Sequence, residues 1–146
     1  MKPRAFLILI LLSTLWPYSV PAQSKGGLHV PARGSSERKA IMDSLRDNFK
    51  EQAGAQVTFN VHYLKVHNGW AWVDVTPLDD KGKAVAEGGP SLLHYEEGSW
   101  KVMGLPELPE DPDDPMPAED ASPRFVKAAR KKYQTLPADI FPKKRK

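Results

Sequence analysis

The sequence predicts an α+β protein in which an N-terminal helix packs on a four-stranded antiparallel sheet, with a C-terminal helix after a linker. Three observations support this fold class. Apolar side chains recur every four residues over 35–53, which is typical of a helix with one buried face. Residues 56–105 contain four short runs rich in β-branched and aromatic residues, separated by turn signals. Residues 106–123 are acidic and proline-rich, and a second helical pattern begins after them.

Residues 1–22 have the pattern of a signal peptide. A short basic start precedes an apolar run at 5–12, which is too short to span a bilayer because spanning needs about 20 residues. Residues 20–22 provide the small side chains that a signal peptidase reads. We therefore expect an exported protein whose mature chain begins at Gln23. An uncleaved N-terminal anchor is the alternative.

The chain has no cysteine among its 146 residues, so it has no disulfide framework, no thiolate metal ligand and no cysteine nucleophile. Small eukaryotic secreted domains usually rely on disulfides, so this composition favours a periplasmic or secreted bacterial protein. Loss of Lys2 and Arg4 with the signal peptide lowers the formal charge from +3 to +1. We expect no nucleic-acid partner. The basic end at 143–146 suits either weak contact with an anionic membrane surface or pairing with the acids of 106–123.

The mature chain is expected to start with a flexible lead-in at 23–34, where glycine, proline and polar residues prevail. A helix is predicted over 35–53. Ser35 or Ser36 can cap its N-terminus, and Gly54 stands where a left-handed residue ends a helix. Its apolar stripe contains Ile41, Met42, Leu45 and Phe49. One face of this helix is therefore expected to be buried.

A hairpin is predicted from 56–67 and 70–78, which flank Asn68-Gly69, the dipeptide that best adopts the two positive φ angles of a type I′ turn. This turn sets His67 opposite Trp70 and fixes the register of the earlier pairs. The face expected to meet the helix holds Leu64, Val66, Ala71, Val73 and Val75. The other, aromatic face holds Phe59, Val61, Tyr63, Lys65, Trp70, Trp72 and Asp74.

A loop at 79–90 leads to a second predicted hairpin, with strands at 91–95 and 100–105. A tight turn between them sets Tyr95 opposite Trp100. These two strands complete the four-stranded sheet.

The α+β domain at 35–105 is followed by a linker at 106–123, which contains six prolines and seven acids in eighteen residues. Proline removes hydrogen-bond donors and the acids repel one another, so we expect an extended segment with neither helix nor strand. The segment 124–146 is expected to form a C-terminal helix and a basic tail. Ser122 can cap this helix, whose apolar residues are Phe125, Val126, Ala129, Tyr133 and Leu136.

Several short motifs resemble an uncharacterised group of small exported bacterial proteins. They are Glu37 to Arg46, Leu64-Lys65-Val66 with Trp70 to Val73, Pro77, Gly82-Lys83, Trp100-Lys101-Val102, and the ending Tyr133 with Ile140-Phe141-Pro142. The order of elements also resembles the cystatin-like and NTF2-like architecture, in which a sheet curls around a helix. The resemblance implies this fold and export. It implies no catalytic residue, because the shared motifs are packing and turn motifs.

Motifs of nucleophilic, zinc and nucleotide chemistry are absent from the sequence: HExxH, GxSxG, the P-loop and GxGxxG do not occur. We therefore expect no catalytic residue, no metal and no cofactor. A metal site would need His62 and His94 on neighbouring strands together with a carboxylate. An acid–base set of Tyr63, Asp74 and His62 does not converge in the predicted register, because His62 points to the other face.

The best candidate for a partner-binding surface is the set Tyr63, Lys65, Trp70 and Trp72 on the aromatic face. Aromatic side chains on a sheet can bind a peptide, a glycan or a protein, and Lys65 opposite Trp72 allows a cation–π contact. The alternative is that the C-terminal helix buries this face.

The sequence therefore favours a small exported, non-catalytic domain that binds an envelope protein, peptide or glycan. Two alternatives remain open. One is a small NTF2-like enzyme or ligand carrier with a pocket inside the curled sheet. The other is an envelope inhibitor or immunity-type protein.

Overall fold

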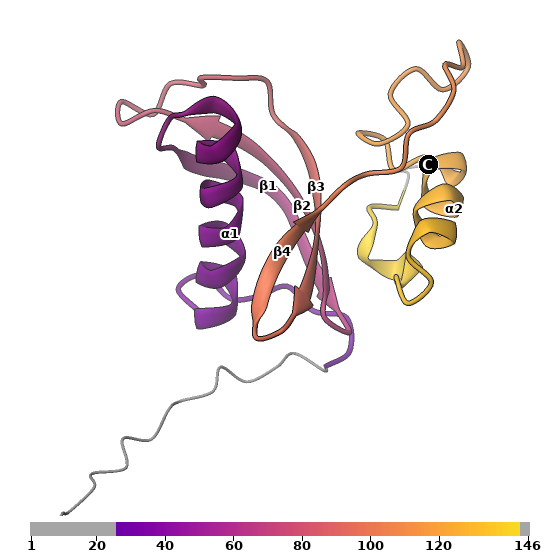
Figure 1. Cartoon of the computed structure of the whole chain (residues 1–146), viewed down its shortest axis with the longest axis horizontal. Helices are drawn as coiled ribbons and strands as arrows, with labels where there is room; N and C mark the ends of the chain where they lie inside the picture. The colour runs from indigo at the N-terminus through magenta and orange to yellow at the C-terminus, as the bar shows by residue number, and fades with distance from the viewer. Residues whose placement is uncertain (1–25, 144–146) are drawn as a thin grey trace, which may run out of the picture.

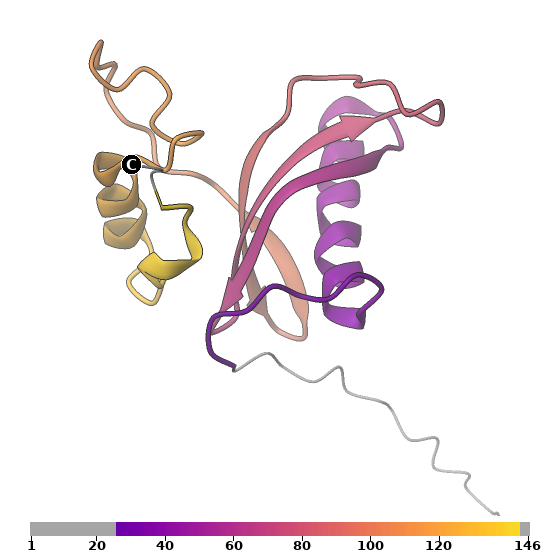
Figure 2. The same ribbon diagram turned by 180° about the vertical axis from the view of Figure 1, so that it is seen from behind.

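The computed structural model describes residues 26–143, in which a four-stranded sheet is covered on both faces (Figure 1). The helix α1, Ser36–Ala53, lies on one face. The C-terminal segment lies on the other, with α2, Pro123–Lys132, and the short 3-10 helix η1, Ala138–Ile140 (Figure 2). The α+β prediction is confirmed. The predicted signal peptide, 1–22, lies outside the described residues, as does most of the basic end.

The sheet is an antiparallel meander in the order β1-β2-β3-β4. Its strands are β1, Thr58–His67, β2, Trp70–Leu78, β3, Gly89–Glu96, and β4, Ser99–Met103. In the first turn, Asn68 and Gly69 have φ angles of 49° and 77°, as a type I′ turn requires. Both hairpin registers set by the turns are confirmed near the turns, with His67 opposite Trp70 and Tyr95 opposite Trp100.

A β-bulge at His62 changes the faces of the residues before it. The register set by the turn holds from His67 back to Tyr63 and shifts before Val61, so His62 is the extra residue. A shift of one residue moves every earlier side chain to the opposite face. The prediction that placed Phe59 and Val61 on the aromatic face is therefore wrong, since both pack against the core beneath α1.

The core beneath α1 forms because the helix ends are well capped and its apolar stripe faces the sheet. The Ser35 hydroxyl accepts a hydrogen bond from the Arg38 N–H at 3.2 Å, and Gly54 ends the helix at φ 68°. The buried residues of this core are Ile41, Met42, Leu45, Leu64, Val66, Ala71, Val73, Val75, Leu93 and Trp100.

The second core lies between the aromatic face and the C-terminal segment. Its buried residues are Trp70, Trp72, Leu92, Ala121, Phe125, Ala129, Leu136, Ile140 and Phe141. The helix α2 ends at Lys132, so Tyr133 and Leu136 follow it instead of continuing it. Leu136 is still 1% exposed, because a turn after the helix brings it back to the sheet.

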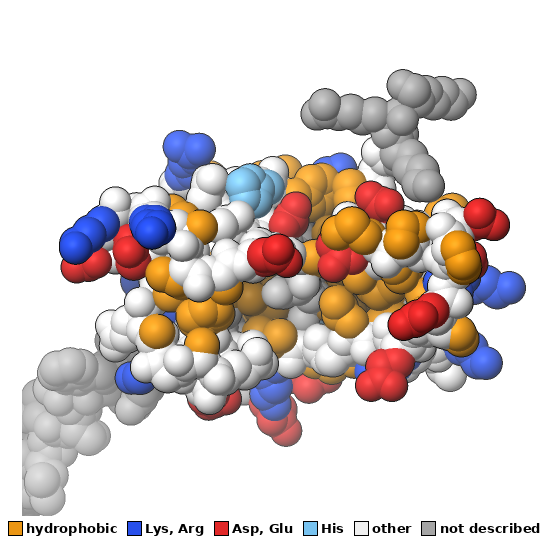
Figure 3. All heavy atoms as spheres, turned by 90° about the horizontal axis from the view of Figure 1, so that it is seen from above, with side chains coloured by type: hydrophobic (Ala, Val, Ile, Leu, Met, Phe, Trp, Pro, Cys, Tyr) orange, Lys and Arg blue, Asp and Glu red, His pale blue; other side chains and the backbone are white. Residues whose placement is uncertain are grey.

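The acidic proline-rich segment has no helix or strand over 106–122, as expected, but it folds against the rest of the chain. Leu108 and Ala118 pack on the second core. Asp114 accepts hydrogen bonds from the Ser122 hydroxyl at 2.7 Å and from the Arg124 guanidinium at 3.2 Å. The segment is therefore a series of docked turns and not an extended connection. Figure 3 shows its acidic side chains among hydrophobic ones at one end of the molecule.

The lead-in also differs from a flexible segment over the residues described. His29 and Val66 exchange two backbone hydrogen bonds of 2.9 Å, which attach residues 26–30 to the outer edge of β1. Pro31 is buried. Within residues 26–143, no helix is both long enough and apolar enough to cross a bilayer.

Candidate functional site

Trp70 and Trp72 do not form an open surface, which corrects the predicted binding face. They are 2% and 1% exposed. Trp72 packs against Phe125 and Phe141, with ring centroids 5.6 Å and 4.8 Å away. Trp70 stacks on His94 at 3.9 Å, and its indole N–H donates to the Thr135 hydroxyl at 3.1 Å. The aromatic face is thus core, because the C-terminal segment covers it.

Tyr63 and Lys65 also take part in holding the covered face together. The Tyr63 hydroxyl donates to the Ile140 carbonyl at 3.0 Å, which fastens β1 to η1. The Lys65 ammonium lies 5.5 Å from the centre of the Tyr63 ring. The expected cation–π partner of Lys65 was Trp72, and the structure replaces it with Tyr63 on the same strand.

The three residues considered as an acid–base set do not converge on a common cavity among the described residues. Tyr63 lies opposite Asp74 on the face covered by the C-terminal segment. The neighbouring His62 bonds to the Thr76 hydroxyl at 2.8 Å. On the other face, apolar side chains fill the space beneath α1. Among the described residues, no group of three His, Asp or Glu is placed to hold a metal ion.

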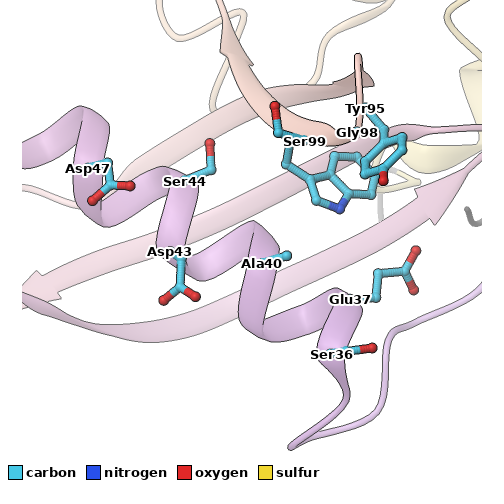
Figure 4. Close-up of a pocket in the computed structure, with 10 residues that line it drawn as sticks. Ser36, Glu37, Ala40, Asp43, Ser44, Asp47, Tyr95, Gly98 and Ser99 are labelled. Carbon is cyan, nitrogen blue, oxygen red and sulfur yellow. The ribbon is translucent and has the colours of Figure 1, made fainter. Parts of the chain in front are cut away.

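A groove of about 310 Å³ lies between α1 and the β3–β4 hairpin (Figure 4). We call it the acidic groove. Its helix wall carries Glu37, Asp43 and Asp47, and its hairpin wall carries Tyr95 and Trp100. Small residues, Ala40, Ser44, Gly98 and Ser99, line the rest of it and leave it open.

Glu37 has the most unusual environment in the acidic groove. Its side chain is 20% exposed, and its Oε2 atom lies 2.8 Å from His29 Nε2. Its Oε1 atom is buried and has no hydrogen-bond partner among the described residues. A carboxylate oxygen can accept two hydrogen bonds. A buried carboxylate oxygen without a donor is therefore an unsatisfied hydrogen-bond acceptor.

His29 is the partner of Glu37. Its Nδ1 atom lies 2.9 Å from the Gly27 carbonyl, while Nε2 faces the carboxylate. Both partners only accept, so the imidazolium is the form that satisfies both bonds. The hydrogen bond to Glu37, with a second to Gly27, raises the pKa of His29 above its ordinary value of 6.5.

The other two acids of the groove differ in how far they are already paired. Asp43 accepts from the Lys39 ammonium at 2.7 Å and also pairs with Arg46. The Lys39 ammonium, followed by Arg46, holds the pKa of the Asp43 carboxyl below its usual range. Asp47 is exposed on the next turn of α1 and makes no hydrogen bond or ion pair with a described residue.

The hairpin wall supplies aromatic surface. Tyr95 and Trp100 face each other across β3 and β4 and meet edge to face, with ring centroids 5.5 Å apart. Trp100 is 7% exposed, so one edge of it forms part of the wall while the rest belongs to the core. The groove therefore combines carboxylates with an aromatic pair, which is a common way to hold a cation.

No protein-family model, curated protein or solved structure matches this chain. The resemblance to small exported bacterial proteins and to the cystatin-like and NTF2-like architecture stays a prediction.

The sequence reasoning missed this groove, although part of its signal is visible. Glu37, Ala40, Ser44 and Asp47 recur at helical spacing and place small and acidic residues along one flank of α1. Nothing in the sequence showed that the β3–β4 hairpin would face that flank. A helix flank on which small side chains lie between acidic ones is therefore the sequence signal of such a groove.

Proposed function

We propose that the protein is an exported, non-catalytic binding domain whose acidic groove takes a lysine or arginine side chain of a partner protein or peptide. The observation that carries the proposal is the buried Glu37 Oε1 atom without a donor. A buried acceptor left without a hydrogen bond costs about 1–3 kcal/mol, and a ligand ammonium or guanidinium toward which the carboxylate turns would remove that cost.

The other groups of the acidic groove support the same ligand class. Asp47 adds a second negative charge that no described residue neutralises. The Tyr95 ring offers a face to a cation, an interaction that contributes about 0.5–2 kcal/mol depending on its exposure. A glycan would use the aromatic wall equally well but would leave Asp47 without a counter-charge. The charges therefore favour a cationic side chain over an envelope glycan.

A non-catalytic role is supported by where the titratable residues lie. Tyr63 is tied to the Ile140 carbonyl, and it faces the core instead of a cavity. Glu37 and His29 form an ion pair that orders the lead-in against α1. Neither arrangement positions an acid and a base on a common substrate.

Export is proposed from residues 1–22 of the sequence. The intact mass of the protein recovered from the periplasm of an expressing bacterium tests this. A mature chain that begins at Gln23 is the expected product, and a protein that keeps residues 1–22 in the membrane fraction would contradict it.

The binding proposal is tested by titrating the folded protein with trilysine amide and following amide chemical shifts. We expect the amide chemical shifts of Ala40, Ser44 and Ser99 to change with trilysine amide. The same three shifts should not change with triglutamate. Glu37→Gln should weaken trilysine binding at least about tenfold, because a hydrogen bond to a charged group contributes about 1.5–3 kcal/mol.

Glu51→Gln is the matched control, since Glu51 is an exposed glutamate in the last turn of the same helix. It removes the same charge away from the groove and should leave the affinity unchanged. Equal losses in both variants would mean that trilysine responds only to the overall charge, and the proposed site would then be wrong.

A further inference from the structure

A second groove lies along the edge strand β1, at the opposite edge of the sheet from β4. It has a volume of about 430 Å³, and three arginines line it: Arg33 before α1, and Arg38 and Arg46 on α1. Thr58 and Asn60 of β1 form its other wall. We call it the arginine groove. No part of the acidic groove lines it.

Two of the arginines are held in place by the chain itself. Arg38 donates to the Pro31 carbonyl at 3.2 Å, and Arg46 pairs with Asp43. Each of these contacts uses only part of the guanidinium, which has five N–H donors. The remaining donors of these two side chains make no other hydrogen bond with a described residue. Because these side chains are already held in place, less side-chain conformational entropy is lost when a ligand binds.

Arg33 adds a charge that the described chain does not compensate. It is exposed and makes no side-chain hydrogen bond or ion pair with residues 26–143. Among residues 26–143, Asp43 is the only carboxylate that forms an ion pair with one of these three arginines, and its partner is Arg46. The groove thus has a net positive charge, beside the Thr58 hydroxyl and the Asn60 amide, which can both donate.

We propose that the arginine groove binds a phosphate group. Three arginines that line one groove suit an oxyanion with several oxygens, and a planar guanidinium bonds phosphate oxygens in pairs. A carboxylate offers only two oxygens and would leave one arginine without a partner. The phosphate can belong to a soluble molecule or to a lipid headgroup, since the groove geometry is the same for both.

The first arm of the test uses sodium phosphate at constant ionic strength, with chloride as the compensating anion. We expect saturable shifts of the Arg38 and Arg46 Nε–H signals and of the Thr58 and Asn60 amides. Arg33→Gln removes an exposed side chain that makes no hydrogen bond or ion pair with a described residue, so the variant should fold normally and bind phosphate at least about fivefold more weakly.

The second arm uses vesicles of phosphatidylglycerol mixed with phosphatidylcholine, and measures sedimentation of the protein with them. Binding to these vesicles but not to free phosphate assigns the phosphate to a lipid, and the reverse result assigns it to a soluble molecule. In either case Arg33→Gln must reduce the binding.

Lys131→Gln is the control for non-specific charge, because Lys131 is an exposed cation on α2, on the other side of the sheet. Its binding should equal that of the unchanged protein. Equal losses in Lys131→Gln and Arg33→Gln, or no binding in either arm, would overturn the proposal. Arg33→Gln should bind trilysine at the acidic groove as the unchanged protein does, because Arg33 does not line that groove, which keeps the two tests separate.

Discussion

Replacement of Phe125 by alanine tests whether the C-terminal segment is part of the folded core. Phe125 is 1% exposed, and its ring lies 5.6 Å from Trp72 and 6.2 Å from Phe141 between centroids. A buried Phe→Ala substitution costs about 3–5 kcal/mol, because it loses apolar contact and leaves a cavity. For a chain of this size that loss lowers Tm by roughly 10–20 °C.

The assay is thermal and urea unfolding followed by circular dichroism and by tryptophan fluorescence. Both signals should shift together, since Trp72 reports on the second core and α1 on the first. Met116→Ala is the matched control in the same segment, because Met116 is 53% exposed. It should change the free energy of unfolding by less than about 0.5 kcal/mol. A loss below about 1 kcal/mol in Phe125→Ala would show that the segment does not cover the sheet as described.

Two further predictions concern single residues. Gly88→Ala should destabilise the fold by about 1–3 kcal/mol, because a Cβ there would lie 2.5 Å from the Thr76 hydroxyl, whereas Gly89→Ala meets nothing within 4 Å and should be nearly neutral. Chemical denaturation of the two variants measures this, and equal stabilities would contradict it. The His29–Glu37 pair should stabilise the fold fully below pH 6.5 and lose its effect as pH rises through the raised pKa of His29. The difference in unfolding free energy between the protein and His29→Gln should therefore shrink with rising pH, and a constant difference would refute the assignment.

The sequence predicted the elements near the sheet's turns well because local chemistry decides them. Asn68-Gly69 fixes the first turn, and both residues have the positive φ angles that it demands. The capping serine and the left-handed glycine bound α1 at the expected residues. The register then holds until His62, where a bulge that no local motif announces moves Phe59 and Val61 to the helix side.

The C-terminal half was less predictable because its structure depends on what it packs against. The prolines and acids of 106–122 exclude helix and strand, but they do not reveal that Arg124 holds Asp111 and Asp114 in turns. In the same way, the helical spacing of the apolar residues predicted a helix that extends to Leu136. The chain leaves the helix at Lys132, and burial of Leu136 depends on a turn that only the tertiary structure shows.

The candidate sites were missed for a related reason. The sequence predicts one buried face of α1 and nothing about its polar residues, which the structure divides between two grooves. Acids and small residues line the flank toward β4, and Arg38 and Arg46 line the flank toward β1. This division follows from helical spacing. Which groove each flank forms depends on the strand that lies beside it, and therefore on the order of the strands in the sheet.

Contact between a bound lysine and the walls of the acidic groove can be measured through intermolecular nuclear Overhauser effects with trilysine amide. We expect cross-peaks from the lysine ε-methylene protons to the rings of Tyr95 and Trp100, and their loss in Glu37→Gln but not in Glu51→Gln. Cross-peaks to residues outside the groove, or peaks that persist in Glu37→Gln, would contradict the assignment of this groove as a site for a cationic side chain.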